Sequence, residues 1–166
     1  MLQSVLTQQV ELGVAYLPVS HPNVQSELLY ENRIVAALPA GYPLEARERL
    51  TVSELAAEPL IGYFGDIPFG DLVRQLFTGF QDEPRPCVEV QQVHVALALV
   101  AAGVGVALVD ELSASSSGRP GIVVRPVDPV IAAPVQLFWR MYEPLSHVAQ
   151  SFVDILKQLD SIAWRP

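Results

Sequence analysis

An uncharged run of residues, Val95–Val109, is the feature that most constrains the fold of this chain, and it stops at Asp110. The run is too short to cross a bilayer as a helix, because a transmembrane helix needs about 20 apolar residues. Its first half is rich in Ala and Leu, which favours a buried helix that ends at Gly103, a residue suited to a left-handed cap. Its last part, Val106–Val109, is typical of a buried strand. A helix followed at once by a buried strand is half of a β-α-β unit, so we expect an open α/β sheet whose ligands lie at the carboxyl ends of its strands.

The composition indicates a folded, acidic protein that does not itself bind nucleic acid. The chain has 166 residues, of which 51% are hydrophobic, and its formal net charge is -8. Among the basic residues only Arg47 and Arg49 lie close together, whereas a phosphate-binding surface needs clustered Lys and Arg. The single cysteine, Cys87, excludes an internal disulfide and fits a reducing compartment. We find no secretory signal or transit segment, and we therefore expect a cytoplasmic protein without a membrane anchor.

Periodicity and turn residues predict alternating strands and helices. The predicted strands are Leu12–Leu17, Leu28–Leu38, Leu60–Phe64, Pro86–Val90, Val106–Val109, Ile122–Val127 and Val135–Tyr142. The predicted helices are Leu2–Gln9, a short one that Thr51 and Glu54 begin as a capping box, Pro68–Phe80, the helix of the uncharged run, and His147–Leu159. Ser146 is placed to cap the last helix, and residues 113–121 have the composition of a flexible loop. The apolar residues of the last helix that we expect on one face are Val148, Phe152, Ile155, Leu156 and Leu159.

The order of these elements predicts a discontinuous layout of two lobes. Residues 39–110 hold a complete β-α-β-α-β set, whereas the parts on either side are each too small to form a domain alone. We therefore expect residues 39–110 to form lobe II, and residues 1–38 and 111–166 to pack together as lobe I. Two crossovers would join the lobes, with a ligand cleft between them.

Three segments, in this order, resemble the effector-binding domain of LysR-type transcriptional regulators. Glu11-Leu-Gly-Val is similar to the family's Asp-Leu-Gly-Ile strand. Leu38-Pro-Ala-Gly-Tyr-Pro-Leu44 is similar to its proline-containing crossover, with Tyr42 where His is usual. Leu99–Val109 is similar to the family's Val-Ala-x-Gly-x-Gly-Ile-x-Leu-Val-Pro segment, with Asp110 where Pro is usual. The similarity extends over nearly the whole chain and points to the muconate-responsive branch, which senses intermediates of aromatic degradation.

The resemblance implies an α/β fold of two Rossmann-like lobes with a cleft, as in periplasmic-binding proteins of type II, and a regulator that senses a small organic acid. It also implies that lobe I is incomplete, because Glu11-Leu-Gly-Val normally follows a first β-α-β unit, and that the DNA-binding helix-turn-helix domain is absent from this chain. Without that unit, the strand Leu12–Leu17 would expose a sheet edge, which is a template for pairing with another chain. We therefore expect a homo-oligomer that contacts DNA only through the absent domain.

The resemblance places effector contacts at Ile67, Pro68 and Phe69, which open a helix just after a strand end. Backbone N–H groups at a helix start can hold a carboxylate, and Phe69 can cover an aromatic or apolar body. The alternative is that Pro68 is simply a first-turn proline and Phe69 a core residue.

Four neutral side chains stand where muconate sensors of the family carry charged ones. Arginines that bind carboxylates occupy the positions of Tyr16 and Tyr30, and an Arg-Glu pair occupies those of Gln91 and Gln92. A tyrosine donates one hydrogen bond and lacks the bidentate fork of arginine, so a dicarboxylate effector is disfavoured. We assign Tyr16 and Gln92 to the ligand site with Ile67–Phe69, although packing alone explains the two tyrosines equally well.

Nothing in the sequence assembles a catalytic, metal or cofactor site. Cys87 and His94 match a nucleophile and a base by residue type alone, since no third residue orients them. No Cys/His spacing suits a metal, and Gly103-Val-Gly105 lacks the third glycine of a nucleotide fingerprint and precedes a strand. We therefore predict no enzyme activity, no metal and no cofactor.

A sensor of a small molecule is the function that these observations favour. A solute-binding protein for transport shares the two-lobe architecture, but it needs a secretion signal or an anchor. A dimerisation fragment without a ligand is a further alternative, because part of the cleft is expected to be absent. Ligand binding distinguishes the sensor from the fragment, since a ligand that binds only the folded state raises the unfolding midpoint.

Overall fold

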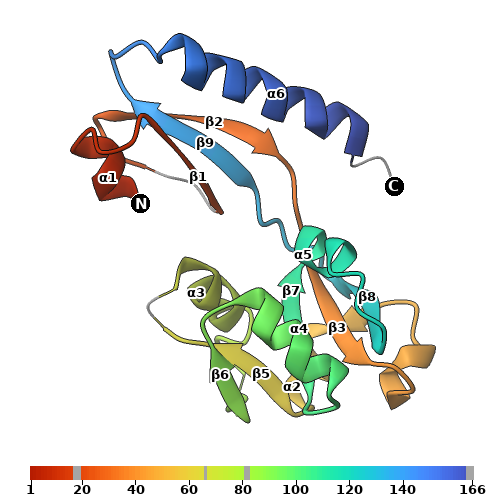
Figure 1. Cartoon of the computed structure of the whole chain (residues 1–166). Coiled ribbons are helices and arrows are strands. Elements are labelled where there is room, and N and C mark those ends of the chain that lie inside the picture. The colour runs from red at the N-terminus through yellow and green to blue at the C-terminus, as the bar shows by residue number, and fades with distance from the viewer. Residues whose placement is uncertain (17–19, 66, 81–82, 164–166) are drawn as a thin grey trace. The chain divides into compact units, whose positions relative to one another are not determined.

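The computed structural model describes residues 1–16, 20–65, 67–80 and 83–163, with side chains up to residue 158. The chain divides into two compact units: unit 1 is Met1–Glu31 with Pro134–Pro166, and unit 2 is Asn32–Ala133 (Figure 1). The sequence led us to place the divisions after residues 38 and 110. They lie after residues 31 and 133, because strands on both sides of the expected divisions belong to one sheet.

Unit 2 is built on a six-stranded sheet of order β4-β8-β3-β7-β5-β6. Its strands are β3 (Ile34–Pro39), β4 (Leu50–Thr51), β5 (Leu60–Tyr63), β6 (Val88–Val90), β7 (Val106–Asp110) and β8 (Ile122–Asp128). Its helices are the 3-10 turn η1 (Pro43–Ala46), α2 (Val52–Ala56), α3 (Pro68–Gln75), α4 (Val93–Ala101) and α5 (Glu111–Ser116). β5 runs parallel to β6 and β7, whereas β3 runs antiparallel to β7 and β8. Because β3 pairs with both β7 and β8, residues 32–38 and 111–133 fall into this unit.

The uncharged run lies at the centre of unit 2 and forms the elements that we expected. It provides most of α4 and then β7, which lies parallel to β5. Gly103 has a φ of 77°, as a left-handed cap requires. A Cβ on Gly105 would meet the carbonyl oxygen of Pro59, so the strand can begin close to this backbone only with glycine there.

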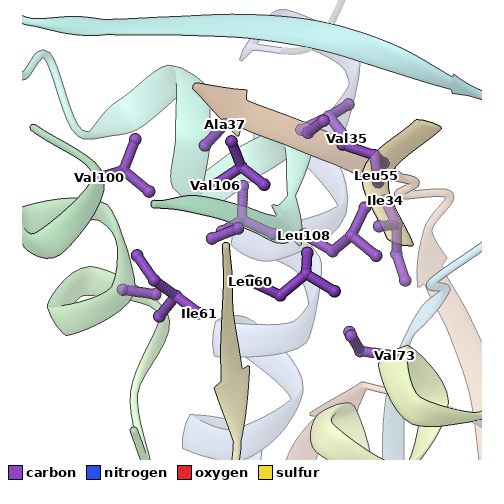
Figure 2. Packing of buried hydrophobic residues seen from close by; sticks show 14 of the residues in the cluster. Ile34, Val35, Ala37, Leu55, Leu60, Ile61, Val73, Val100, Val106 and Leu108 are labelled. Carbon is purple, nitrogen blue, oxygen red and sulfur yellow. The ribbon is translucent and has the colours of Figure 1, made fainter. Parts of the chain in front are cut away.

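Helices cover both faces of the central strands in unit 2. Figure 2 shows Ile61 on the side of Val100 and α4, and Leu108 on the side of Val73 and α3. Successive residues of a strand point to opposite faces, so a run of apolar residues is buried on both sides. The result is one large cluster of buried residues that extends from Ile34 to Ala133.

Two local predictions were wrong, one of them only in part, and a third was confirmed. The predicted strand Leu28–Leu38 is two strands, β2 (Val24–Tyr30) of unit 1 and β3, separated by polar residues at 31–33. The segment 113–121, expected to be a loop, begins within α5. The capping box is present, with the amide N–H of Glu54 donating to Thr51 Oγ1 at 3.2 Å and the Glu54 carboxylate accepting from Thr51.

Unit 1 is a three-stranded sheet of order β1-β9-β2 between two helices. Both outer strands, β1 (Leu12–Tyr16) and β2, run antiparallel to β9 (Val135–Arg140). Along β9, Val135 and Leu137 lie in the cluster with Val153 of α6 (His147–Ala163), whereas Phe138 packs with Val5 of α1 (Leu2–Leu6). The two helices therefore cover opposite faces of the sheet, and β1 and β2 are its edges. The last residue of the predicted first strand, Leu17, lies outside the described residues.

The final helix begins where the sequence predicted. The hydroxyl oxygen of Ser146 accepts from the amide N–H of Ala149 at 3.2 Å, which is the expected N-terminal cap. In the described part of the chain, no helix combines the length and the apolar character that crossing a membrane requires.

The packed face of α6 differs from the predicted one. Ala149 and Val153 are buried, and Leu156 is half-buried beside them. Three residues that we expected on the packed face lie instead on an exposed flank, with exposed fractions of 80%, 47% and 55% for Val148, Phe152 and Ile155. The side chain of Leu159 lies outside the described residues. Alanine and valine fit closely against the small three-stranded sheet, and the larger side chains remain outside.

Candidate functional site

Three helices of unit 2 begin at one edge of its sheet. The parallel strands β5, β6 and β7 end there and lead into α3, α4 and α5. The amide N–H of Phe64 donates to the carbonyl oxygen of Val90 at 3.2 Å, so the ends of β5 and β6 stay side by side. A helix N-terminus attracts anions, and the carboxyl edge of parallel strands is the usual place for a ligand in an open α/β sheet.

The N-terminus of α5 is occupied by the protein itself. The Asp110 carboxylate accepts from the amide N–H of Ser113 at 2.9 Å and from the side-chain amide of Asn32 at 3.2 Å. Asp110 is only 1% exposed and Asn32 only 7%. A buried carboxylate at this helix start excludes a second anion, because like charges repel strongly where water is absent.

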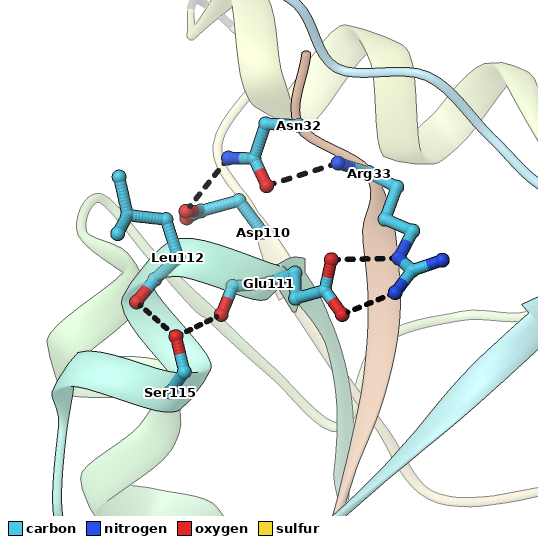
Figure 3. A network of polar contacts seen from close by, with 6 residues as sticks. All are labelled: Asn32, Arg33, Asp110, Glu111, Leu112 and Ser115. Carbon is cyan, nitrogen blue, oxygen red and sulfur yellow. Dashed lines mark hydrogen bonds and ion pairs between the residues drawn. The ribbon is translucent and has the colours of Figure 1, made fainter. Parts of the chain in front are cut away.

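A polar network connects this helix to the segments that enter and leave unit 2 (Figure 3). Arg33 donates to both carboxylate oxygens of Glu111, from Nε at 2.6 Å and from Nη2 at 2.8 Å. The carbonyl oxygen of Asn32 accepts from the amide N–H of Ala133 at 2.7 Å, which joins the first and last residues of the unit. The network therefore fixes α5, and with it the end of β7.

The N-terminus of α3 has no such cap from the residues that the structure describes. Ile67 is its N-cap residue, and no side chain in the described part of the chain makes a capping hydrogen bond there. Pro68 has no N–H, and the first intrahelical bond runs from the amide N–H of Asp71 to the carbonyl oxygen of Ile67 at 3.0 Å. The amide of Gly70 therefore lies in the turn that a carboxylate would approach.

The side chain of Phe69 belongs to the core rather than to the exposed edge. It is 7% exposed and packs edge-to-face on Tyr63, with ring centroids 5.2 Å apart. The Tyr63 hydroxyl donates to the carbonyl oxygen of Leu108 at 3.0 Å. Burial, and then the nearby charge of Asp110, raise the pKa of Tyr63. Of the alternatives for Phe69, core packing describes its ring, while its backbone remains in the first turn of α3.

The N-terminus of α4 is the second uncapped one. Gln92 is its N-cap residue and is exposed, and its carbonyl oxygen accepts from the amides of Val95 and Ala96 at 3.0 and 3.2 Å. No capping hydrogen bond from a described side chain is present. The structure thus brings Gln92 to the same sheet edge as Ile67 and Pro68, as the sequence predicted.

Tyr16 is the last residue of β1 in unit 1, and Tyr30 lies at the same level of the sheet on the other side of β9. Tyr16 and Tyr30 both pair in register with Val135, one from each side. Both side chains lie in the cluster on the α6 face of the sheet. Two phenols therefore flank one position of β9, at the carboxyl ends of β1 and β2.

Two residues of the site in unit 2 were missed by sequence reasoning. Phe64 is 42% exposed and directly follows β5, at the edge where α3 and α4 begin. Asp110 caps α5. It stands where the family usually has proline, and this difference could have indicated the cap from the sequence. In contrast, Cys87 and His94 lie before and after β6, which spans roughly 10 Å, so the structure does not bring them together as a nucleophile and base.

The model of the LysR substrate binding domain family matches residues 1–161. The transcriptional activator protein LysR of Escherichia coli (strain K12) is 32% identical over 118 residues, which cover 71% of this chain and 38% of LysR. The transcriptional regulator BenM of Acinetobacter baylyi is 27% identical over 155 residues, which cover 91% of this chain and 51% of BenM. The chain thus spans about half, or less, of the length of these relatives.

A solved structure of the BenM effector-binding domain with its effector benzoate has the same fold. The two superpose with a TM-score of 0.78 at 23% identity, over 99% of this chain and 77% of that chain. The predicted α/β fold, of the two-lobe type seen in periplasmic-binding proteins of type II, is thereby confirmed.

Proposed function

Because this chain belongs to the LysR substrate binding domain family, we propose that it binds a small organic acid and is the effector-sensing part of a transcriptional regulator. The observation that carries the proposal is the contrast at one sheet edge of unit 2, where no described side chain caps α3 or α4 and Asp110 caps α5. Backbone amides at the first two helix starts would hold the carboxylate. The exposed ring of Phe64 would cover an apolar body.

The neutral residues of the site favour a monocarboxylate. Gln91 and Gln92 carry no charge, so a second carboxylate beside them would lose its hydration without gaining a cation. Benzoate, which BenM binds, is therefore the first ligand to test. In this proposal Ile67, Pro68, Phe69 and Gln92 belong to the carboxylate site of unit 2, and the assignment of Tyr16, in unit 1, to a ligand site stays a prediction.

The rest of the regulator is also part of the proposal. The relatives that match are regulators of transcription and not enzymes, and the domain is a regulatory one. We propose that a helix-turn-helix domain outside this sequence contacts DNA in the cytoplasm, and that the effector shifts populations by binding one arrangement of the regulator more tightly than another. The 166 residues alone would not bind a promoter in a gel-shift assay.

We also propose that the chain forms a homo-oligomer through unit 1. Among the described strands β1 is an edge that pairs only with β9, and the stripe Val148–Ile155 on α6 exposes apolar side chains. In a solution of the pure chain a second copy is the partner available to cover these groups. Sedimentation that shows only a monomer up to about 100 μM, where a contact of micromolar affinity would be saturated, would count against this part.

Isothermal titration with benzoate and with its neutral analogue benzamide tests the acid site. We expect benzoate to bind and benzamide to bind at least about tenfold more weakly, because the helix termini select the charge. An Ile67→Asp variant should lose benzoate binding, since its own carboxylate would cap α3. Thr51→Asp adds the same charge at the start of α2 and should leave binding unchanged. Equal binding of both ligands would contradict the carboxylate site, and no binding of any small acid would favour the dimerisation fragment.

A further inference from the structure

Unit 1 contains a cavity of about 280 Å³ that the proposed acid site does not use. It lies between the connection from α1 to β1 and the connection from β9 to α6, at the end of the sheet opposite Tyr16 and Tyr30. Trp139, Leu145 and Val10 provide apolar walls. Pockets for small ligands begin near this size, at roughly 300 Å³, so the cavity is suited to a compact molecule.

Both connections that form the walls are held in uncommon backbone conformations. Gln8 has a φ of 59° and Tyr142 a φ of 68°, in the left-handed region that residues other than glycine rarely adopt. The side-chain amide of Gln8 donates to both carboxylate oxygens of Glu143 at 2.9 Å, so one connection is tied to the other. Such backbone strain persists only where the surroundings hold it, and it gathers at binding sites.

The charges in the cavity do not cancel. Arg140 lies 3.1 Å from Glu143 and neutralises it. Glu11 accepts from the amide N–H of Ser146 at 2.9 Å, and these hydrogen bonds from Ser146 lower the pKa of the Glu11 carboxyl. Among the ion pairs of the described residues, none includes Glu11. The cavity therefore offers one ionised carboxylate beside an aromatic wall.

We propose that this cavity binds an organic ammonium ion with a small apolar body, its nitrogen against Glu11 and its body against Trp139 and Leu145. The carboxylate of Glu11 repels an organic acid here, whereas the uncapped helix starts of unit 2 attract one. The two sites thus select ligands of opposite charge. An ammonium near the face of Trp139 gains from the negative charge of the indole ring.

The first test compares ligands of one shape and different charge in the unmodified chain. Benzylamine hydrochloride and benzyl alcohol are each titrated by calorimetry, and benzylamine should bind about two- to fivefold more tightly, the factor expected for an exposed ion pair. A saturating amount of benzoate should leave the benzylamine titration unchanged. Equal affinities, no binding of benzylamine, or displacement by benzoate would each overturn the proposal.

The second test removes the charge and keeps the shape. Glu11→Gln retains an acceptor for the amide of Ser146 and should weaken benzylamine binding about two- to fivefold while leaving benzoate binding intact. Glu27→Gln, which removes a carboxylate of unit 1 that pairs with Lys157 outside the cavity, is the matched control and should change neither. An unchanged benzylamine affinity in Glu11→Gln would overturn the assignment. If Glu11→Gln does not fold, as circular dichroism would show, the comparison of ligands in the unmodified chain decides alone.

Discussion

The two units of this molecule differ in how completely their sheets are covered. In unit 2, helices bury both faces of the central strands, and the polar groups at the start of α5 are satisfied within the unit. In unit 1, no described strand pairs with the outer edge of β1, and α6 exposes three large apolar side chains beside two small clusters of buried residues. The difference matches the two roles that we propose: a preformed carboxylate site requires the rigidity of unit 2, and association requires uncovered surface such as that of unit 1.

The largest expected effect is on the core of unit 2. Leu108→Ala should reduce the free energy of unfolding of that unit by about 2–5 kcal/mol, because Leu108 is 1% exposed in the large cluster. Both tryptophans, Trp139 and Trp164, lie outside residues 32–133, so their fluorescence reports unit 1. The urea midpoint measured by far-ultraviolet circular dichroism should fall, while the midpoint measured by tryptophan fluorescence should not change. Equal shifts of both signals would show that the two units unfold as one.

A somewhat smaller effect is expected at the cap of α5. Asp110→Ala should lower the free energy of unfolding by about 2–4 kcal/mol. The substitution removes the cap of α5 and leaves the buried side-chain amide of Asn32 without its acceptor. Asp110→Asn keeps an acceptor oxygen and should cost less than half as much. Chemical denaturation of the two variants checks the order, and equal losses would mean that the charge rather than the hydrogen bonds matters.

Next in size is a change confined to the exposed flank of unit 1. Phe152→Asp should weaken self-association at least about tenfold, since burying an unpaired carboxylate opposes contact, and it should alter stability by less than about 0.5 kcal/mol because Phe152 is 47% exposed. Sedimentation velocity over a range of concentrations measures the first quantity and thermal unfolding the second. Gln158→Asp, which adds the same charge to the exposed face of α6, is the control for charge alone. If the Phe152→Asp variant still forms the dimer with unchanged affinity, the interface does not include this flank of α6.

The smallest expected effect is on the pH dependence of unfolding, to which one carboxylate in each unit contributes. Hydrogen bonds from Thr51 lower the pKa of Glu54, and those from Ser146 lower the pKa of Glu11. Because the pKa is lower in the folded state, each carboxylate stabilises the fold at pH values above its unfolded-state pKa of 4.5. This stabilisation is lost as the pH falls through the folded-state pKa. Unfolding between pH 6 and pH 3 should therefore depend less on pH in Glu54→Gln and in Glu11→Gln than in the unmodified chain. Unchanged pH dependence in both variants would contradict the assignment of these bonds.

Elements with a strong local signal were predictable, and the boundaries set by distant pairing were not. The uncharged run, the capping box at Thr51 and the cap at Ser146 follow from residues within a few positions of one another. The extended run 28–38 gave no sign that β3 pairs with β7 and β8, which are more than 60 positions away, and so the expected divisions were displaced. The exposed flank of α6 was missed because periodicity finds apolar residues without showing which side of a helix the sheet contacts.

At the candidate site, chain order and resemblance placed Ile67, Pro68 and Gln92 at strand ends, and the structure brings them to one edge. Sequence reasoning did not show that the ring of Phe69 is buried against Tyr63, because both core and surface aromatics follow a helix start. It also did not show that Asp110 closes α5, since a cap is recognised only when the helix after it is known.

The central claim is that uncapped helix starts in unit 2 bind a carboxylate, and amide chemical shifts test it most directly. Benzoate is titrated into ¹⁵N-labelled chain, and the amides at Gly70 in α3 and at Val93 and His94 in α4 are compared with that of Ser113 in α5. We predict saturable shifts at the first three amides and none at Ser113, whose N–H already donates to Asp110. Shifts of equal size at all four amides, or at none of them, would contradict the account.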